Sequence, residues 1–246
     1  GFMIPATFLH AGRVFRPWIS SPEFWVMAAI APLIFLYIMI QLFGGLVRQL
    51  TGSFNSVNAT ILVLVAWAFI LAITGSSTIF SERQAGLYER FAVMPAPLGS
   101  ALAGRVVAEF ARIILMMTIV GVVSVVAIRD KTYPDHPIVI LPVLLLVALA
   151  AATLGTLVGF TITSVQGAVA VMPLIVVAMF INTQLMPAEQ FRPILRSIAD
   201  WTPVSVVGQA VNAHTIGDIL PFILWFVGIT ALCGLGLMRR ARTLQH

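Results

Sequence analysis

The sequence has 246 residues, of which 60% are hydrophobic and only 9% carry a formal charge, and its mean hydropathy is +1.03. A soluble domain is roughly 25% charged, so these figures exclude a water-soluble globule, and they exclude disorder because disordered segments are polar and charged. The net charge of +5 comes from 14 basic and 9 acidic residues. The composition therefore predicts a polytopic integral membrane protein.

The identity of the basic residues excludes further functions. Thirteen are Arg and one is Lys131, which follows Asp130 and precedes Thr132. The phosphate-binding sequence G-x-x-x-x-G-K, followed by Ser or Thr, needs a Lys that reaches the phosphates, so ATP-driven work would need a second polypeptide. The Arg residues lie singly between apolar runs, which argues against a nucleic-acid partner. The lone Cys233 has no partner for a disulfide or a metal site, so we expect no metal and no cofactor in this chain.

Residues 1–22, the first segment in chain order, are predicted to form an amphipathic helix in the plane of the inner membrane surface. Its apolar residues Ile4, Phe8, Phe15 and Ile19 recur at helical spacing, with basic residues between them. We expect no secretory signal peptide, because the first long apolar run begins only after this mixed segment.

Six apolar stretches follow, each near the roughly 20 residues that a helix needs to cross a bilayer. We place the spans at about 25–47, 57–80, 102–128, 138–160, 166–186 and 219–238. Helices are required, because an open sheet in lipid would leave backbone groups unpaired. The predicted fold is an all-α integral membrane protein with a single transmembrane domain over residues 1–246.

The inner segment 81–97, after the second span, carries four charges within nine positions. Ser81 is placed to cap a helix there, and Pro95 and Pro97 end it. Glu82, Gly86 and Arg90 are four residues apart, so one continuous helix would put them on one face. We predict a short helix parallel to the membrane, against the alternative of a solvated connector.

The third span contains three charges at helical spacing, Arg105, Glu109 and Arg112. Their spacing favours pairing with one another near the inner surface. A proton relay is the alternative.

The outer segment 187–217 is predicted to contain two short helices. Phe191, Ile194, Leu195 and Ile198 follow a helical pattern, and Pro203 separates them from a second helix that carries three valines. The segment is either a re-entrant gate or an interfacial helix pair that covers the end of the bundle.

Basic residues set the orientation of the spans. Six spans leave both termini on one side, and termini inside gives an inner set of eight basic residues: Arg13, Arg16, Arg83, Arg90, Arg105, Arg239, Arg240 and Arg242. The outer set then has five: Arg48, Arg129, Lys131, Arg192 and Arg196, while Arg112 lies within the third span and is not counted. We therefore expect both termini on the cytoplasmic side of the membrane.

The inner segment also resembles a family signature. The spacing of Glu82, Gly86, Glu89-Arg90-Phe91 and Pro95 is similar to that in permease subunits of type-2 ABC exporters, and closest to the daunorubicin/doxorubicin-resistance branch. Pro187, Trp201-Thr202-Pro203 and the final Arg239-Arg240-Ala241-Arg242 extend the resemblance over nearly the whole chain. Leu87 departs from it, since many relatives have Thr after the Gly.

The resemblance implies a half-transporter. Two permease subunits, identical or homologous, would pair in the membrane lipid and dock on two cytosolic ABC ATPase subunits, which bind ATP and Mg. Segment 81–97 would be the coupling helix, with Glu82, Arg83, Gly86, Glu89 and Arg90 in contact with the ATPase. The substrate would be an amphipathic, anthracycline-like drug or a complex cell-envelope lipid, moved outward.

Several polar residues lie within the spans, toward the outer side: Gln41, Asn58, Asn182, Thr183 and Gln184. They are predicted to line the outer part of a substrate pathway between two permeases, against the alternative of interhelical hydrogen bonds or headgroup contacts.

Two rival functions remain. A membrane-embedded hydrolase has little support, because Gly75-Ser76-Ser77 is not G-x-S-x-G and no His lies within a span. An ion-coupled secondary transporter would place an acidic residue at the midplane, and only the third span contains an acidic residue well inside it. We therefore predict that the chain is not itself an enzyme.

Overall fold

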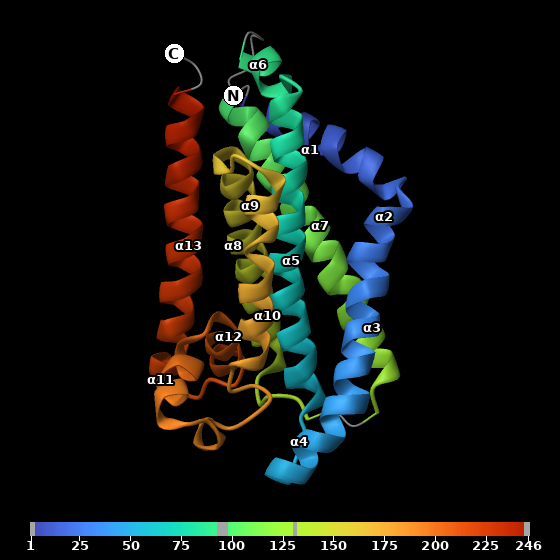
Figure 1. Cartoon of the computed structure of the whole chain (residues 1–246), viewed down its shortest axis with the longest axis vertical. Coiled ribbons are helices and arrows are strands. Elements are labelled where there is room, and N and C mark those ends of the chain that lie inside the picture. The colour runs from blue at the N-terminus through green and yellow to red at the C-terminus, as the bar shows by residue number, and fades with distance from the viewer. Residues whose placement is uncertain (1–2, 93–97, 130–131, 244–246) are drawn as a thin grey trace.

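The computed structural model describes residues 3–92, 98–129 and 132–243, and within these ranges every regular element is helical (Figure 1). The elements are α1 (Met3–Ile19), α2 (Pro22–Trp25), η1 (Val26–Ile30), α3 (Ala31–Ile38), η2 (Met39–Phe43), α4 (Gly44–Thr51), α5 (Ser56–Gln84), α6 (Leu87–Ala92), α7 (Leu98–Ala127), η3 (Pro137–Val139), α8 (Ile140–Thr161), α9 (Val165–Val169), α10 (Met172–Phe180), η4 (Ala188–Gln190), α11 (Pro193–Trp201), α12 (Pro203–Val211) and α13 (Ile216–Thr243).

Five helical segments of the described chain are long and apolar enough to cross a membrane: Pro22–Thr51, Ser56–Gln84, Gly99–Ala127, Pro137–Thr161 and Ile216–Thr243. They coincide with five of the six predicted spans. The molecule is therefore a multi-pass membrane protein, and the composition correctly indicated its class.

The fifth predicted span, 166–186, differs from the prediction. The structure has two short helices there, α9 and α10, which together form an apolar unit from Val165 to Phe180. Pro173 lies in the first turn of α10, where proline is tolerated because that N–H has no helical partner. The helix ends at Phe180, and residues 181–186 form turns. Sixteen residues extend about 24 Å, which is less than the hydrocarbon core of about 30 Å.

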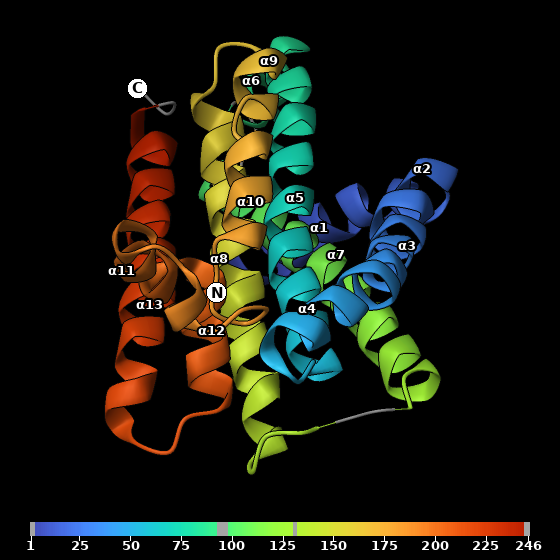
Figure 2. The ribbon, with the colours of Figure 1, turned by 60° about the horizontal axis from the view of Figure 1, so that its bottom comes forward.

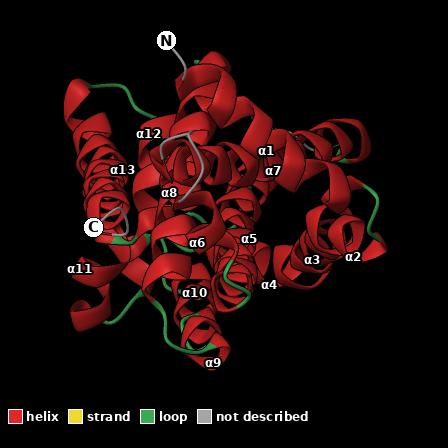
Figure 3. Ribbon diagram, turned by 90° about the horizontal axis from the view of Figure 1, so that it is seen from above, coloured by secondary structure: helices red, strands yellow, loops and turns green. Residues whose placement is uncertain are grey.

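Helix α5 lies at the centre of the bundle. In its most apolar stretch of 18 residues 67% are buried, against 17% in the corresponding stretch of α13. Figure 3 shows α5 among the other helices, with α2 and α3 on one flank and α13 on the opposite one. The flanking helices expose large apolar side chains such as Leu42 and Leu232. Such surfaces suit lipid or another membrane subunit.

Small residues let α5 and α8 approach closely. A Cβ on Gly155 would lie 2.5 Å from the Ala72 carbonyl oxygen, and one on Gly159 would lie 2.6 Å from Ile79 Cβ. Membrane helices pack on such small residues because lipid supplies no hydrophobic drive between them. Figure 2 shows α9 and α10 running beside this central pair.

The first span contains two π-helical stretches, η1 and η2. A π turn leaves backbone groups out of the regular ladder, and such turns concentrate at functional sites. At η1 the Trp67 indole of α5 donates a hydrogen bond to the Met27 carbonyl over 2.9 Å. This bond fixes the first span against the central helix.

Both termini of the described chain lie at the same end of the bundle as α6, whereas α4, α11 and α12 lie at the other end (Figure 1). Helix α1 matches the predicted helix at 1–22 and packs across α7. Its position in the plane of the membrane stays a prediction.

The segment 187–217 contains the two predicted helices. Helix α12 is buried in the bundle, with Val206 and Val207 fully covered, whereas α11 leaves Ile194 82% exposed. The buried α12 and the exposed α11 therefore play different structural roles. Re-entry into the membrane stays a prediction.

Candidate functional site

Four charged side chains form a continuous chain of ion pairs between α5 and α7, which we call the charge chain: Glu82, Arg105, Glu109 and Arg112. Arg105 Nη1 lies 2.7 Å from Glu82 Oε1, and its Nη2 lies 3.0 Å from Glu109 Oε1. Arg112 Nη2 lies 2.6 Å from Glu109 Oε2. The predicted pairing on α7 is present, and Glu82 of α5 extends it.

Three of the four members of the charge chain are buried, and the Glu82 side chain is 23% exposed, so the members depend on one another. Glu109 and Arg105 are 0% and 1% exposed, and Arg112 is 8% exposed. Arg112 also donates to the Leu71 carbonyl, and Arg105 donates to the Gly75 carbonyl over 3.4 Å. Burying an isolated charge costs several kcal/mol by order of magnitude, so each charge here needs its partners.

Gly75 makes room for this arrangement on α5. A Cβ at this position would overlap the Glu109 carboxylate and lie 2.6 Å from Arg112 Nη2. The Gly75-Ser76-Ser77 run, which does not match the hydrolase motif G-x-S-x-G, therefore has a packing role at its glycine.

Helix α1 covers the charge chain through Trp18. The guanidinium carbons of Arg105 and Arg112 lie 5.0 and 4.8 Å from the centre of the Trp18 ring. Cation–π attraction at this range stabilises desolvated arginines. Three elements, α1, α5 and α7, thus meet at one charged centre.

The segment 81–97 differs from the predicted single helix. Helix α5 continues to Gln84, so Ser81 does not cap a new helix and instead donates to the Ser77 carbonyl over 3.1 Å. Gly86 then adopts φ +70°, a conformation that glycine tolerates best, and the chain turns into α6. Residues 93–97, including Pro95, lie outside the described residues.

The break at Gly86 divides the predicted ATPase-contact residues into two groups. Glu82 and Arg83 precede the turn and are bound within the chain, because Arg83 donates to the Gly159 and Ile162 carbonyls over 3.0 and 3.2 Å. Glu89 and Arg90 follow it and are exposed. The expected common face of Glu82, Gly86 and Arg90 is therefore wrong, since the positive φ interrupts the helix.

Two aromatic residues fasten α6 to the bundle. Tyr88 donates to Glu82 Oε2 over 2.8 Å, and its ring centre lies 4.7 Å from that of Phe160 in α8. Burial, and next the Glu82 carboxylate, raise the pKa of Tyr88 above its usual value. The phenol therefore stays protonated and keeps donating to Glu82.

Phe91 connects α6 to α1. The Arg13 guanidinium carbon lies 4.5 Å from the centre of the Phe91 ring, and the His10 ring centre lies 5.1 Å from it. Burial, and next Arg13, lower the pKa of His10, which favours the neutral imidazole at pH 7. Sequence reasoning gave Tyr88 and Trp18 no role at this centre, although both aromatic residues lie within two positions of a charged residue in the sequence.

The predicted pathway residues do not gather at one site. Asn182 is fully buried, and its Oδ1 accepts from Gln184 N over 2.8 Å, while Thr183 N donates to the Ser205 hydroxyl over 2.9 Å. The Gln184 side chain covers Gly208 so closely that no Cβ fits there. These three residues shape the turn after α10 against α12.

Gln41 and Asn58 lie elsewhere. Gln41 is exposed in η2 and lines a pocket of about 400 Å³ between the first span, α5 and α7. Asn58 lies in the first turn of α5, where its backbone N–H donates to the Asn55 side chain over 3.2 Å. A role for the five residues in a substrate pathway stays a prediction.

The fold and this site define a polytopic helical membrane protein in which a short helix at one end is joined by buried charges to two long helices and to α1. The chain belongs to the ABC-2 type transporter family, which matches residues 6–216. It is similar to the probable doxorubicin resistance ABC transporter permease protein DrrC of Mycobacterium tuberculosis, in strain H37Rv and in strain CDC 1551. The identity is 26% over 257 residues, covering 98% of this chain and 90% of each relative.

Proposed function

We propose that the chain is the permease subunit of an ATP-driven exporter whose ATP is bound and hydrolysed by a separate cytosolic subunit. The ABC-2 family match and the permease relatives support this assignment. The sequence contains no nucleotide-binding lysine motif, which agrees with ATP binding by a second polypeptide.

The observation that carries the mechanism is the link from α6 to the charge chain. The exposed Glu89 and Arg90 are the ATPase contacts, whereas Tyr88, Phe91 and Glu82 fasten α6 to α1, α5 and α7. Closure of the ATPase subunits on ATP would push α6. Because α6 is fixed to long helices, that push would move them as one rigid group.

The coupling residues therefore have two roles in this proposal. Glu89 and Arg90 bind the partner, and Glu82 and Arg83 transmit the movement without touching it. Gly86 supplies the turn between the two pairs.

We further propose a complex of two permeases and two ATPase subunits in the bacterial plasma membrane, with the α6 end of the bundle in the cytoplasm. The excess of basic residues at that end supports the orientation. The exposed apolar flanks of the first span and α13 provide surface for a second permease.

The proposed cargo is an amphipathic molecule moved outward, either an anthracycline-like drug or a complex cell-envelope lipid. The name of the mycobacterial relatives supports the first class. The predominantly apolar spans are compatible with both.

Purification and reconstitution test the assignment. The chain should copurify with an ABC ATPase subunit, and the pair in proteoliposomes should hydrolyse ATP faster when an exported amphiphile such as doxorubicin is added. Export by the chain alone, driven by a proton gradient without ATP, would instead identify an ion-coupled carrier.

A further inference from the structure

A pocket at the end of the bundle opposite α6 combines two arginines with an apolar wall. Its volume is about 400 Å³, within the range of small-molecule sites. Arg48 of α4 and Arg129 after α7 line it together with Gln41 and the apolar side chains Leu36 and Ile40. Residues far apart in the sequence thus converge on one concave surface.

The two arginines have no carboxylate partner in the described part of the chain. The ion pairs found there are the charge chain and one His214–Asp135 contact, and neither Arg48 nor Arg129 takes part in them. Asp130 and Lys131, which follow Arg129 in the sequence, carry opposite formal charges. Among the described residues that line the pocket, the charged side chains are therefore the two arginines, without a carboxylate.

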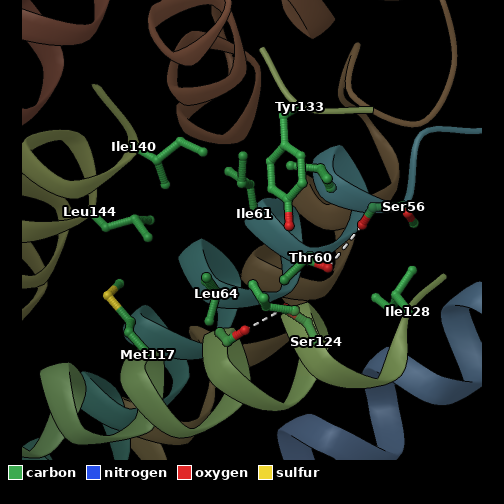
Figure 4. A pocket seen from close by; sticks show the side chains of 13 residues that line it. Ser56, Thr60, Ile61, Leu64, Met117, Ser124, Ile128, Tyr133, Ile140 and Leu144 are labelled. Carbon is green, nitrogen blue, oxygen red and sulfur yellow. Dashed lines mark hydrogen bonds between the residues drawn. The ribbon is translucent and has the colours of Figure 1, made fainter. Parts of the chain in front are cut away.

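A second cavity, of about 170 Å³, adjoins this pocket between α5, α7 and α8, and the two share Ser56, Ser124 and Ile128 as lining residues (Figure 4). Its wall is mainly apolar, with Leu64 and Met117 among the side chains.

Two of the hydroxyl groups that line this second cavity are directed to their own helices. Thr60 donates to the Ser56 carbonyl and Ser124 donates to the Gly121 carbonyl, each over 2.8 Å. The hydroxyl groups of Thr60 and Ser124 are therefore already hydrogen-bonded, and the mainly apolar wall suits an apolar chain. A cationic pocket and an apolar cavity in contact match a molecule with an acidic head and an apolar tail.

We propose that these two spaces together bind an anionic amphiphile, with its phosphate or other acidic head at Arg48 and Arg129 and its tail in the cavity beside Gly121. Arginine binds phosphate oxygens through charge-assisted hydrogen bonds. The site disfavours a cationic amphiphile, because both charged side chains in its wall are positive. A phospholipid of the bilayer and an acidic molecule in transit share this chemistry.

Binding of radiolabelled dodecyl phosphate to the full-length chain in phosphatidylcholine nanodiscs tests the proposal. Wild-type binding should be saturable, and neither dodecyltrimethylammonium nor inorganic phosphate at equal concentration should compete. Arg48→Gln and Arg129→Gln should each weaken binding about three- to tenfold, as expected for charge-assisted bonds from exposed arginines. Arg48→Lys should restore most of it.

Matched variants separate this site from general charge effects. Arg192→Gln removes an exposed arginine before α11, at the same end of the molecule, and should bind dodecyl phosphate as the wild type does. Gly121→Leu fills the apolar cavity and should abolish binding, whereas Gly234→Leu adds the same side chain where a Cβ meets nothing and should have no effect.

The source of the amphiphile is decided by two further arms. A resident phospholipid is indicated if phosphatidylglycerol in the nanodisc displaces the probe. A transported molecule is indicated if phosphatidylglycerol does not displace it but MgATP with the ATPase subunit releases it.

Equal competition by inorganic phosphate, equal binding of the cationic amphiphile, or unchanged binding by Gly121→Leu would overturn the proposal. The binding assay needs no ATPase subunit, so it is independent of whether the exporter assignment is correct.

Discussion

At the scale of single residues, a change of charge is expected to have different effects at Arg90 on α6 and at Glu109 on α7. Arg90 is on the surface, where a change of charge alters recognition and leaves folding intact. Glu109 is fully buried between two arginines, where a change of charge alters folding.

Arg90→Glu should weaken the complex with the ATPase subunit and lower coupled ATP hydrolysis and export. A tenfold weaker complex corresponds to about 1.4 kcal/mol, a modest effect for a reversed charge in an interface. Copurification and ATPase assays in proteoliposomes measure it. Arg192→Glu, at the other end of the molecule, is the control. Wild-type export by Arg90→Glu would remove α6 as the ATPase contact.

Glu109→Gln should destabilise the protein by about 3–5 kcal/mol, because two buried arginines lose their shared counter-charge. Thermal unfolding in detergent should show a clearly lower midpoint. Glu189→Gln, which alters an exposed carboxylate in η4, should leave the midpoint unchanged. Equal midpoints for Glu109→Gln and the wild type would mean that the charge chain is not a stabilising unit.

At the scale of elements, the turn between α5 and α6 is the most specific feature of the proposed lever. Gly86 is, with Gly52, one of two described residues with positive φ, and both are glycines. An L residue at this position strains the backbone by about 1–3 kcal/mol.

Gly86→Ala should therefore shift the direction of α6 and reduce coupled ATP hydrolysis more than it reduces protein yield. Basal hydrolysis by the ATPase subunit alone is unaffected by definition, so the ratio of stimulated to basal rate is the measurement. Gly228→Ala adds the same methyl group in α13 where no atom lies within 4 Å, and it should behave as wild type. Indistinguishable ratios for the two variants would contradict the role of the turn.

Among the elements, hydropathy and its periodicity predicted the long apolar spans and the amphipathic helices. Five spans, α1 and the two helices of the outer segment appear where periodicity placed them. The pattern failed at 166–186, because hydropathy does not distinguish a continuous apolar helix from one that ends at Phe180. It failed again at Gly86, because one backbone angle decides whether α6 continues α5.

The candidate site was predictable only within single elements. Spacing paired Arg105, Glu109 and Arg112 because all three lie on α7. The addition of Glu82 and Trp18 depends on contacts between elements more than 20 residues apart, which periodicity cannot supply. The pocket at Arg48 and Arg129 was missed for the same reason.

At the scale of the whole molecule, the arrangement predicts which ends face the same compartment. Gln84, beside α6, and Ser197, in α11, are both exposed and lie at opposite ends of the bundle (Figure 1). In a Cys233→Ser background, Ser197→Cys should react with a membrane-impermeant maleimide in intact cells. Gln84→Cys should react only after the cells are permeabilised. Labelling of both residues, or of Gln84→Cys alone, in intact cells would contradict the proposed orientation.

The charge chain also has a consequence for how the protein is made. A helix that carries Arg105, Glu109 and Arg112 enters a bilayer at a cost of about 2.5–3.5 kcal/mol for each charge placed near its centre. Its partners, Trp18 and Glu82, precede it in the chain and are therefore synthesised first. We therefore expect the emerging α7 to meet the Glu82 carboxylate and the Trp18 ring, both already synthesised, so that the order of translation favours its insertion.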